Sequence, residues 1–311
     1  LVVWDREIAR IDVLARAASA FTDVLVAQEE VVLAEEGVRL AREVVDTVTA
    51  RVRAGGASSV ELTNAEVAAA SARLELDEAR HELEIARREL AVSWGSTTAR
   101  FSHAAGNLDR LAPAPSLEAV EARIDESPSV ARWTSELLER QAIVDLERAR
   151  AVPDVTARGG YRRLFDPDEN TFVVGVTVPL PVLNRNQGAI LAAEHRADAA
   201  RSDRAATRLR VLQAIDDAHH ALITARARIT TLDADVLPGA KKAFAALNDG
   251  YREGRFGYLE VLDARRTLIA ARGQRVRALG EYRRAVVQLE RLVGEPLDPE
   301  LAGSGDEEVV R

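Results

Sequence analysis

A helical pattern that runs without interruption from Val3 to about Arg53 is the feature that most restricts the fold of this chain. It contains no proline, and apolar residues recur at steps of three and four, as in Ile8, Ile11 and Ala15. At about 1.5 Å per residue, such a helix is roughly 75 Å long. Helices in globular domains are much shorter. The sequence therefore predicts an elongated helical protein.

The composition agrees with close helix packing and excludes several functions. Hydrophobic residues make up 47% of the 311 positions but aromatic residues only 4%, so helices are expected to pack in close contact. The net charge of −8 argues against nucleic acid as a partner, because phosphate binding needs clustered lysine and arginine. Without cysteine there are no disulfides or thiolate ligands. Methionine is also absent, even at position 1, which predicts that Leu1 lies inside a longer protein.

Glycine and proline divide the rest of the helical sequence. A break at residues 54–59 precedes a second helix, expected over Val60 to Trp94, and the two make an antiparallel hairpin. A polar connector follows over residues 97–115, and the later pattern is interrupted at 237–239 and 249–254. One further helix is predicted to begin at about residue 116. Four others are predicted over residues 128–151, 187–236, 240–248 and 258–293.

Residues 153–181 have a period of two instead. Apolar and small residues alternate with polar ones on both sides of a polar turn at residues 166–170, which predicts a β-hairpin. An isolated two-stranded hairpin is only marginally stable in water, so its edges are expected to pair with strands from elsewhere. A window of 18 or more apolar residues is absent, which excludes a transmembrane helix.

The two halves of the chain match at a fixed offset of 199 residues, which indicates an internal duplication. The pairs with most weight are Arg53 with Arg252, Gly55 with Gly254, Glu61 with Glu260, and Gly95 with Gly294. The second half has a β-hairpin before its helices, so a first hairpin is expected upstream of Leu1.

Two motifs give these features a family resemblance. Residues 178–188 read VPLPVLNRNQG, and the tip at residues 251–254, Tyr-Arg-Glu-Gly, is followed by YLEVLDA at 258–264. With the helical hairpins and the duplication, they resemble the outer membrane factor family of TolC-like efflux ducts, over roughly residues 3–296. The first motif is similar to the strand-to-helix junction of the CzcC-like branch, which serves heavy-metal efflux pumps.

The resemblance implies a mainly α fold with a membrane β-hairpin. Long antiparallel helical hairpins in tandem repeat would form a trimeric α-barrel and a shared twelve-stranded β-barrel. Sequence and resemblance together predict a first-repeat helical hairpin at 1–95, a connector and helices at 96–152, an outer-membrane β-hairpin at 153–181, a second-repeat helical hairpin at 182–294 and a disordered tail at 295–311.

The implied function is a passive exit duct in the outer membrane of a Gram-negative bacterium, with its helical part in the periplasm. As a homotrimer it would work with a periplasmic adaptor protein and an inner-membrane RND pump, and would export heavy-metal cations. Two alternatives stay open. One is a duct for drugs or type I secretion substrates, and the other is a soluble coiled-coil periplasmic scaffold or adaptor.

The resemblance also assigns residues to the two helix tips. Glu260 and Asp263, one helical turn apart, and Glu61 in the first repeat would form an acidic entrance aperture that is gated by movement of the tips and favours cations. The alternative is that they are solvated acids at helix starts, where the helix dipole favours them. The adaptor would dock at the tips, with the docking residues Arg53, Gly55, Arg252 and Gly254.

Strand residues are assigned by parity. The lipid-facing set is Phe172, Val174, Val176 and Val178, and the lumen-facing set is Thr156, Arg158, Arg162 and Thr177. The alternative is a soluble hairpin packed on its own helices.

Catalysis, cofactors and resident metals are not expected. The sequence has no Ser-His-Asp arrangement, phosphate loop or HExxH pattern, so no catalytic residue and no cofactor are assigned. The adjacent His219 and His220 do not share a helix face, so no metal site is expected.

Overall fold

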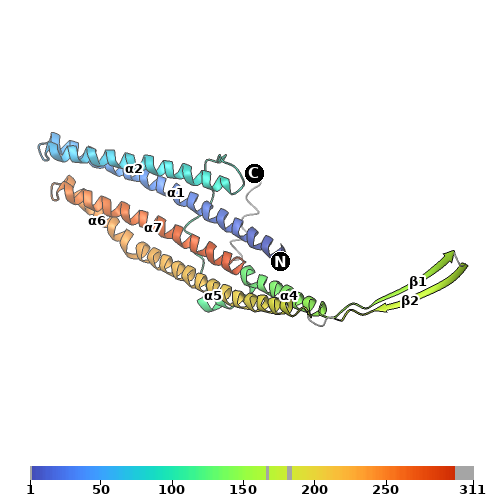
Figure 1. Cartoon of the computed structure of the whole chain (residues 1–311). Coiled ribbons are helices and arrows are strands. Elements are labelled where there is room, and N and C mark those ends of the chain that lie inside the picture. The colour runs from blue at the N-terminus through green and yellow to red at the C-terminus, as the bar shows by residue number, and fades with distance from the viewer. Residues whose placement is uncertain (1, 166–167, 181–183, 298–311) are drawn as a thin grey trace. The chain divides into compact units, whose positions relative to one another are not determined.

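The computed structural model describes residues 2–165, 168–180 and 184–297, which form long helices and one β-hairpin (Figure 1). The chain divides into two compact units. One joins the first residues, up to Asp5, to residues 128–211, and the other joins residues 6–127 to the chain from residue 212 onward. Within the described ranges, none of the helices combines the length and the apolar character that a membrane-spanning helix needs.

The first helical hairpin follows the predicted periodicity. α1 (Val2–Arg53) has 52 residues, and α2 (Ser59–Val92) returns antiparallel beside it (Figure 1). Gly55 ends α1 in the left-handed region at φ 73°, which costs glycine little. The Ser58 Oγ accepts the Glu61 N–H at 3.2 Å and caps α2.

The second half of the chain differs from the prediction at two points. α5 (Gln187–Thr231), the π-helical turn η2 (Leu232–Val236) and α6 (Leu237–Arg252) follow one another directly, so the predicted interruption at 237–239 is wrong. The π turn adds a residue where Pro238 cannot donate an N–H. The predicted break at 249–254 also starts too early, because Gly250 lies inside the helix. The turn is at Gly254, with φ 80°, and α7 (Tyr258–Val293) follows as predicted.

The polar connector is held by side chains from distant helices. Gln28 donates to the Ala104 carbonyl at 3.0 Å and accepts the Ala104 N–H at 2.7 Å. The Tyr282 hydroxyl donates to the Ala112 carbonyl at 2.8 Å. These bonds satisfy backbone groups that lie outside regular structure. Short helices follow, α3 (Leu117–Glu121) and η1 (Ile124–Glu126), and then α4 (Pro128–Ala149).

The β-hairpin pairs β1 (Thr156–Phe165) with β2 (Asp168–Thr177) antiparallel. Pairing extends to Phe165 and Asp168, so residues 168–170, predicted as turn, belong to β2, while 166–167 lie outside the described residues. Val178, predicted as a strand residue, lies just beyond the end of β2. Tyr161 and Phe172 are opposite each other in the register, with ring centroids 5.3 Å apart and planes tilted by 55°, a cross-strand pair that stabilises the hairpin.

Small residues let the helices of the larger unit pack closely, as the composition predicted. One core cluster of α1 and α2 consists of Val38, Ala41, Ala69 and Ala72. Gly280 of α7 lies so near α1 that an added Cβ would come within 2.7 Å of Val26. Past α7, Glu295 pairs with Arg123 and the Leu297 N–H donates to Glu290 at 3.1 Å. The rest of the predicted disordered tail lies outside the described residues.

Candidate functional site at the helix tips

The tips of the two helical hairpins have the same backbone structure. At the first tip, the Gly56 N–H donates to the Arg51 carbonyl at 2.8 Å. At the second, the Arg255 N–H donates to the Gly250 carbonyl at 2.7 Å. Each is the six-to-one bond of a Schellman motif, closed by a glycine at positive φ. The equivalent residues are 199 positions apart, so the backbone supports the duplication inferred from sequence.

Arg51, Tyr251 and Glu61 join the two tips, and we call this group the tip contact. The Arg51 guanidinium donates to the Tyr251 carbonyl at 2.9 Å and to the Gly56 carbonyl at 2.7 Å. It also lies 4.2 Å from the centroid of the Tyr251 ring, a cation–π distance. The Tyr251 hydroxyl in turn donates to Glu61 Oε2 at 3.0 Å. Helices α1, α2 and α6 are therefore held together by polar bonds at their ends.

Burial keeps the Tyr251 hydroxyl protonated and able to donate. The residue is 1% exposed, and this burial, reinforced by the Glu61 carboxylate, raises the pKa of Tyr251 to about 12. The phenol therefore stays a neutral donor to Glu61 throughout the physiological range.

An apolar cluster lies beneath the tip contact. Tyr251 and Tyr258 meet edge to face, with centroids 6.4 Å apart, and the cluster also contains Val44, Val48, Ala65 and Val261. The Tyr258 hydroxyl is buried without a hydrogen-bond partner among the described residues. Burial raises the pKa of Tyr258. The tips are thus joined by an apolar base and a polar cap.

Two of the three predicted aperture acids have local partners. Glu260 Oε2 accepts the Gly257 N–H at 2.6 Å, so this carboxylate caps α7. Glu61 is half-buried and accepts from Tyr251. Asp263 is exposed one turn along α7, and its first-repeat equivalent is Asn64, also exposed. The entrance aperture stays a prediction, and Asp263 is the acid of the three that forms no hydrogen bond with another described residue.

The predicted docking residues lie on the surface of the tips. Arg53, Gly55, Arg252 and Gly254 are all exposed. The two glycines make the turns, and the two arginines extend from the ends of α1 and α6. The arginine that joins the tips is Arg51, two residues before the predicted Arg53.

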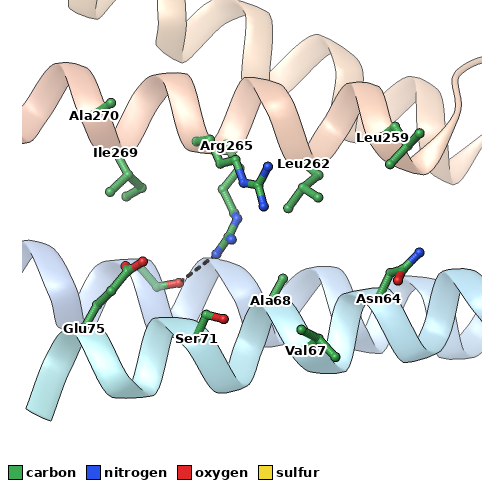
Figure 2. A pocket seen from close by; sticks show the side chains of 12 residues that line it. Asn64, Val67, Ala68, Ser71, Glu75, Leu259, Leu262, Arg265, Ile269 and Ala270 are labelled. Atoms are coloured by element: carbon green, nitrogen blue, oxygen red, sulfur yellow. Dashed lines mark hydrogen bonds between the residues drawn. The ribbon is translucent and has the colours of Figure 1, made fainter.

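A cleft of about 510 Å³ lies between α2 and α7 and extends from the first turns of these helices as far as Glu75 and Ala270 (Figure 2). Arg265 of α7 points into it and donates to the Gly37 carbonyl of α1 at 3.4 Å, the dashed line in Figure 2. The arginine is only 9% exposed, and burial lowers its pKa. Glu75 faces the same cleft from α2. Arg265 thus places a cation between the two helical hairpins.

The two faces of the β-hairpin differ in the way the sequence predicted. Over residues 156–162 and 171–177, the apolar strand face consists of Ala157, Gly159, Tyr161, Phe172, Val174 and Val176. Over the same residues, the arginine strand face consists of Thr156, Arg158, Gly160, Arg162, Thr171, Val173, Gly175 and Thr177. Phe172 and Val174 are 79% and 84% exposed, so nothing in the described chain covers the apolar face.

The described residues contain no group of three or more His, Asp or Glu side chains able to hold a metal ion. His219 instead lies 2.9 Å from the Pro115 carbonyl, and His220 pairs with Asp216 at 3.4 Å. Both histidines thus have contacts that belong to the helical scaffold.

Sequence reasoning missed Arg51, Tyr251 and Arg265. A signal existed for the last, because Arg265 lies between Val261 and Leu268 in the buried stripe of α7, where an apolar residue is expected. Tyr251 offered a weaker signal as an aromatic residue beside a turn. Arg51 offered no signal. Both Arg51 and Arg53 lie in the last turn of α1, and the local sequence does not distinguish which of them contacts the other tip.

Comparison with known proteins agrees with this architecture. Residues 3–96 and 119–295 match the family described as outer membrane efflux protein. The cobalt-zinc-cadmium resistance protein CzcC of Cupriavidus metallidurans is 39% identical over 91% of this chain and 68% of its own length. The nickel-cobalt-cadmium resistance protein NccC of Alcaligenes xylosoxydans is 28% identical over 62% of this chain and 44% of its own.

Two solved structures share the fold. CusC superposes with a TM-score of 0.80 at 19% identity, covering 94% of this chain and 70% of that one. The outer membrane protein VceC of Vibrio cholerae superposes with a TM-score of 0.79 at 19% identity, covering 95% of this chain and 72% of that one. Helical hairpins, β-hairpin and sequence match lead to one conclusion: the chain belongs to the outer membrane efflux protein family, in the outer membrane with its helical part in the periplasm.

Proposed function

We propose that the protein is the passive exit duct of a tripartite RND-type efflux system and exports heavy-metal cations. Three copies would close their helices into a periplasmic tunnel and their strands into one barrel. A periplasmic adaptor would dock at the tips, and an inner-membrane pump would supply the energy. The duct itself would catalyse no reaction.

The observation that carries the proposal is the bare β-hairpin. Its apolar face is exposed, and within the described residues the outer edges of β1 and β2 have no strand partner. Exposure of such an apolar face to water is unfavourable, and unpaired strand edges promote aggregation by pairing with strands of other molecules. Closure with strands of other subunits in lipid satisfies both, because every backbone group in a membrane must be paired. A soluble scaffold would leave both unsatisfied.

The tip contact supports gating at the periplasmic end. It holds the second helical hairpin against the first through one arginine and one tyrosine hydroxyl. Breaking these bonds would free α6 and α7 to move relative to α1 and α2. We place the gate here, with the acids of the tips at the aperture.

Heavy-metal cations are the cargo favoured by similarity. The 39% identical relative is named for cobalt, zinc and cadmium resistance. Pyoverdine as an alternative cargo is supported by a weaker similarity. A pyoverdine export outer membrane protein of Pseudomonas putida, OpmQ, is 24% identical over 93% of this chain and 63% of its own length. Sensitivity of a deletion strain to metal salts, compared with its export of pyoverdine, distinguishes the two.

The molar mass of the full-length protein tests the duct directly. The protein is extracted from membranes in mild detergent and measured by light scattering with the detergent contribution subtracted. We expect the mass of three subunits, obtained only in detergent. A monomer or dimer recovered without detergent would contradict the proposal and restore the coiled-coil scaffold.

A further inference from the structure

Two arginines lie on the strand face that the proposed duct turns toward its lumen. Arg158 is opposite Gly175 and Arg162 is opposite Thr171, so both belong to the arginine strand face. Both side chains are exposed. Among the described side chains, no carboxylate forms an ion pair with either guanidinium.

The neighbours of Arg158 leave its charge open to water. Gly160 and Gly175 lie beside and opposite it, and a Cβ at either glycine would meet no atom within 4 Å. Over residues 156–162 and 171–177, this face has two arginines and no acid. This part of the hairpin therefore has a net positive face.

We propose that Arg158 and Arg162 make the exit part of the duct prefer anions to cations. The inference rests on the proposed duct function, because trimer closure would repeat each arginine around one lumen. At about 3.3 Å per strand residue, the two positions form bands roughly 13 Å apart along the strand. Rings of arginine favour anions, since a guanidinium stays charged at all physiological pH values and raises the counter-ion concentration in a narrow channel.

The two ends of the duct then carry opposite charge. The tips offer carboxylates to an entering cation, whereas the exit offers guanidinium groups. Cargo that carries anionic ligands passes the exit more readily than a bare divalent cation does. A metal ion bound by small carboxylates or phosphate has this chemistry.

Ion selectivity of the full-length channel in planar lipid bilayers tests the inference. A KCl gradient gives the chloride-to-potassium permeability ratio, measured in an E260Q/D263N background so that the tip acids do not dominate. We expect a ratio above one, and R158Q/R162Q should lower it by at least about twofold. The matched control R158K/R162K keeps the charge and should keep the ratio.

The separate variants and the salt dependence sharpen the result. R158Q and R162Q should each lower the ratio by less than R158Q/R162Q does, because each leaves one arginine in place. In the protein with both arginines, the chloride-to-potassium permeability ratio should fall toward one as the salt concentration is raised, because mobile ions screen the arginines. This measurement does not depend on whether a strand variant assembles. An unchanged ratio in R158Q/R162Q, or one that ignores salt, overturns the inference. Failure of every form to conduct contradicts the duct function instead.

Discussion

Tyr258 has an unfavourable hydroxyl at a site that otherwise favours an aromatic ring. The ring packs edge to face on Tyr251 in a buried cluster, while its oxygen has no partner among the described residues. A buried polar group without a hydrogen bond lowers stability.

Tyr258→Phe should therefore stabilise the protein by about 1 kcal/mol. The ring and its contacts are kept, and only the unpaired oxygen is removed. The check is the thermal unfolding midpoint in detergent, which should rise. Tyr282→Phe is the matched control, because its hydroxyl donates to Ala112 at 2.8 Å, and its midpoint should fall. A lower midpoint for Tyr258→Phe would show that the hydroxyl has a partner in the assembled protein.

Tyr251→Phe should weaken the tip contact and raise channel conductance. The substitution removes the hydrogen bond to Glu61 but keeps the ring under Arg51. Single-channel recordings should show more frequent or larger openings than in the unaltered protein. Tyr282→Phe loses a similar bond far from the tips and should leave conductance unchanged. Equal conductance in Tyr251→Phe and the unaltered protein would remove the tip contact from the gate.

The stabilisation contributed by the Tyr251 hydroxyl should depend on pH in the alkaline range. The folded pKa of Tyr251, about 12, lies above its ordinary value of 10.0. A raised folded pKa means that the stabilisation is complete below pH 10 and is lost as pH rises from there through 12. The difference in unfolding midpoint between the unaltered protein and Tyr251→Phe should be constant up to about pH 10 and shrink above it. A difference that grows above pH 10 would contradict the sign.

At the scale of elements, two glycines end helices and reverse the chain. Gly55 and Gly254 have φ values of 73° and 80°, where an L side chain is strained. Gly239 differs from these two glycines because it lies inside α6 without a positive φ. A Cβ at this position would meet no atom within 4 Å.

Gly254→Ala should lower stability by about 1–2 kcal/mol. Gly239→Ala is the control and should raise stability by about 0.4–1 kcal/mol, because alanine loses less backbone freedom in a helix. Unfolding midpoints followed by helical circular dichroism should shift in opposite directions. A harmless Gly254→Ala would show that the tip can adopt another turn.

The β-hairpin provides a matched pair of neighbouring valines on opposite faces. Val174→Arg places a charge on the apolar strand face, at a cost of about 2–4 kcal/mol near the bilayer midplane. Val173→Arg places it on the arginine strand face, which the proposed duct turns toward its water-filled lumen. The amount of trimer recovered from outer membranes should collapse for the first variant and change little for the second. Equal recovery would contradict the assignment of the faces.

At the scale of the whole molecule, trimer closure would bring the tip acids of three subunits together. Glu61 and Glu260 each have a local partner, whereas Asp263 is exposed without a hydrogen bond or ion pair to another described residue. A single subunit gains little from such acids, but three copies around an aperture sum their fields.

Replacing the acids, as in E61Q/E260Q/D263N, should reduce the potassium-to-chloride permeability ratio by at least about twofold. The control is Glu253→Gln, because Glu253 is an exposed tip acid that pairs with Arg255 at 2.5 Å and lies outside α7. It should leave the ratio unchanged. If the control lowers the ratio as much as the triple variant, the aperture is not where we place it.

Local periodicity in the sequence was sufficient for most elements of the fold. Apolar steps of three and four predicted α1, α2 and α7, the last with its observed ends at Tyr258 and Val293. Period two predicted the β-hairpin and which of its residues share a face, although β2 ends before Val178 and begins inside the predicted turn. The fixed offset of 199 residues predicted two tips of equal structure. These features depend on residues near one another in the chain, so the sequence displays them directly.

Tertiary contacts decided the rest. Pro238 and Gly250 were predicted breaks, yet a π turn and burial keep them inside a continuous helix. Which arginine joins the tips, and that Arg265 is buried between hairpins, depends on how residues about two hundred positions apart come into register. A pattern within one helix fixes which face is apolar, but only packing between helices fixes which polar groups meet. The sequence determined most of the elements by itself, and the tertiary structure alone decided the contacts at the tips.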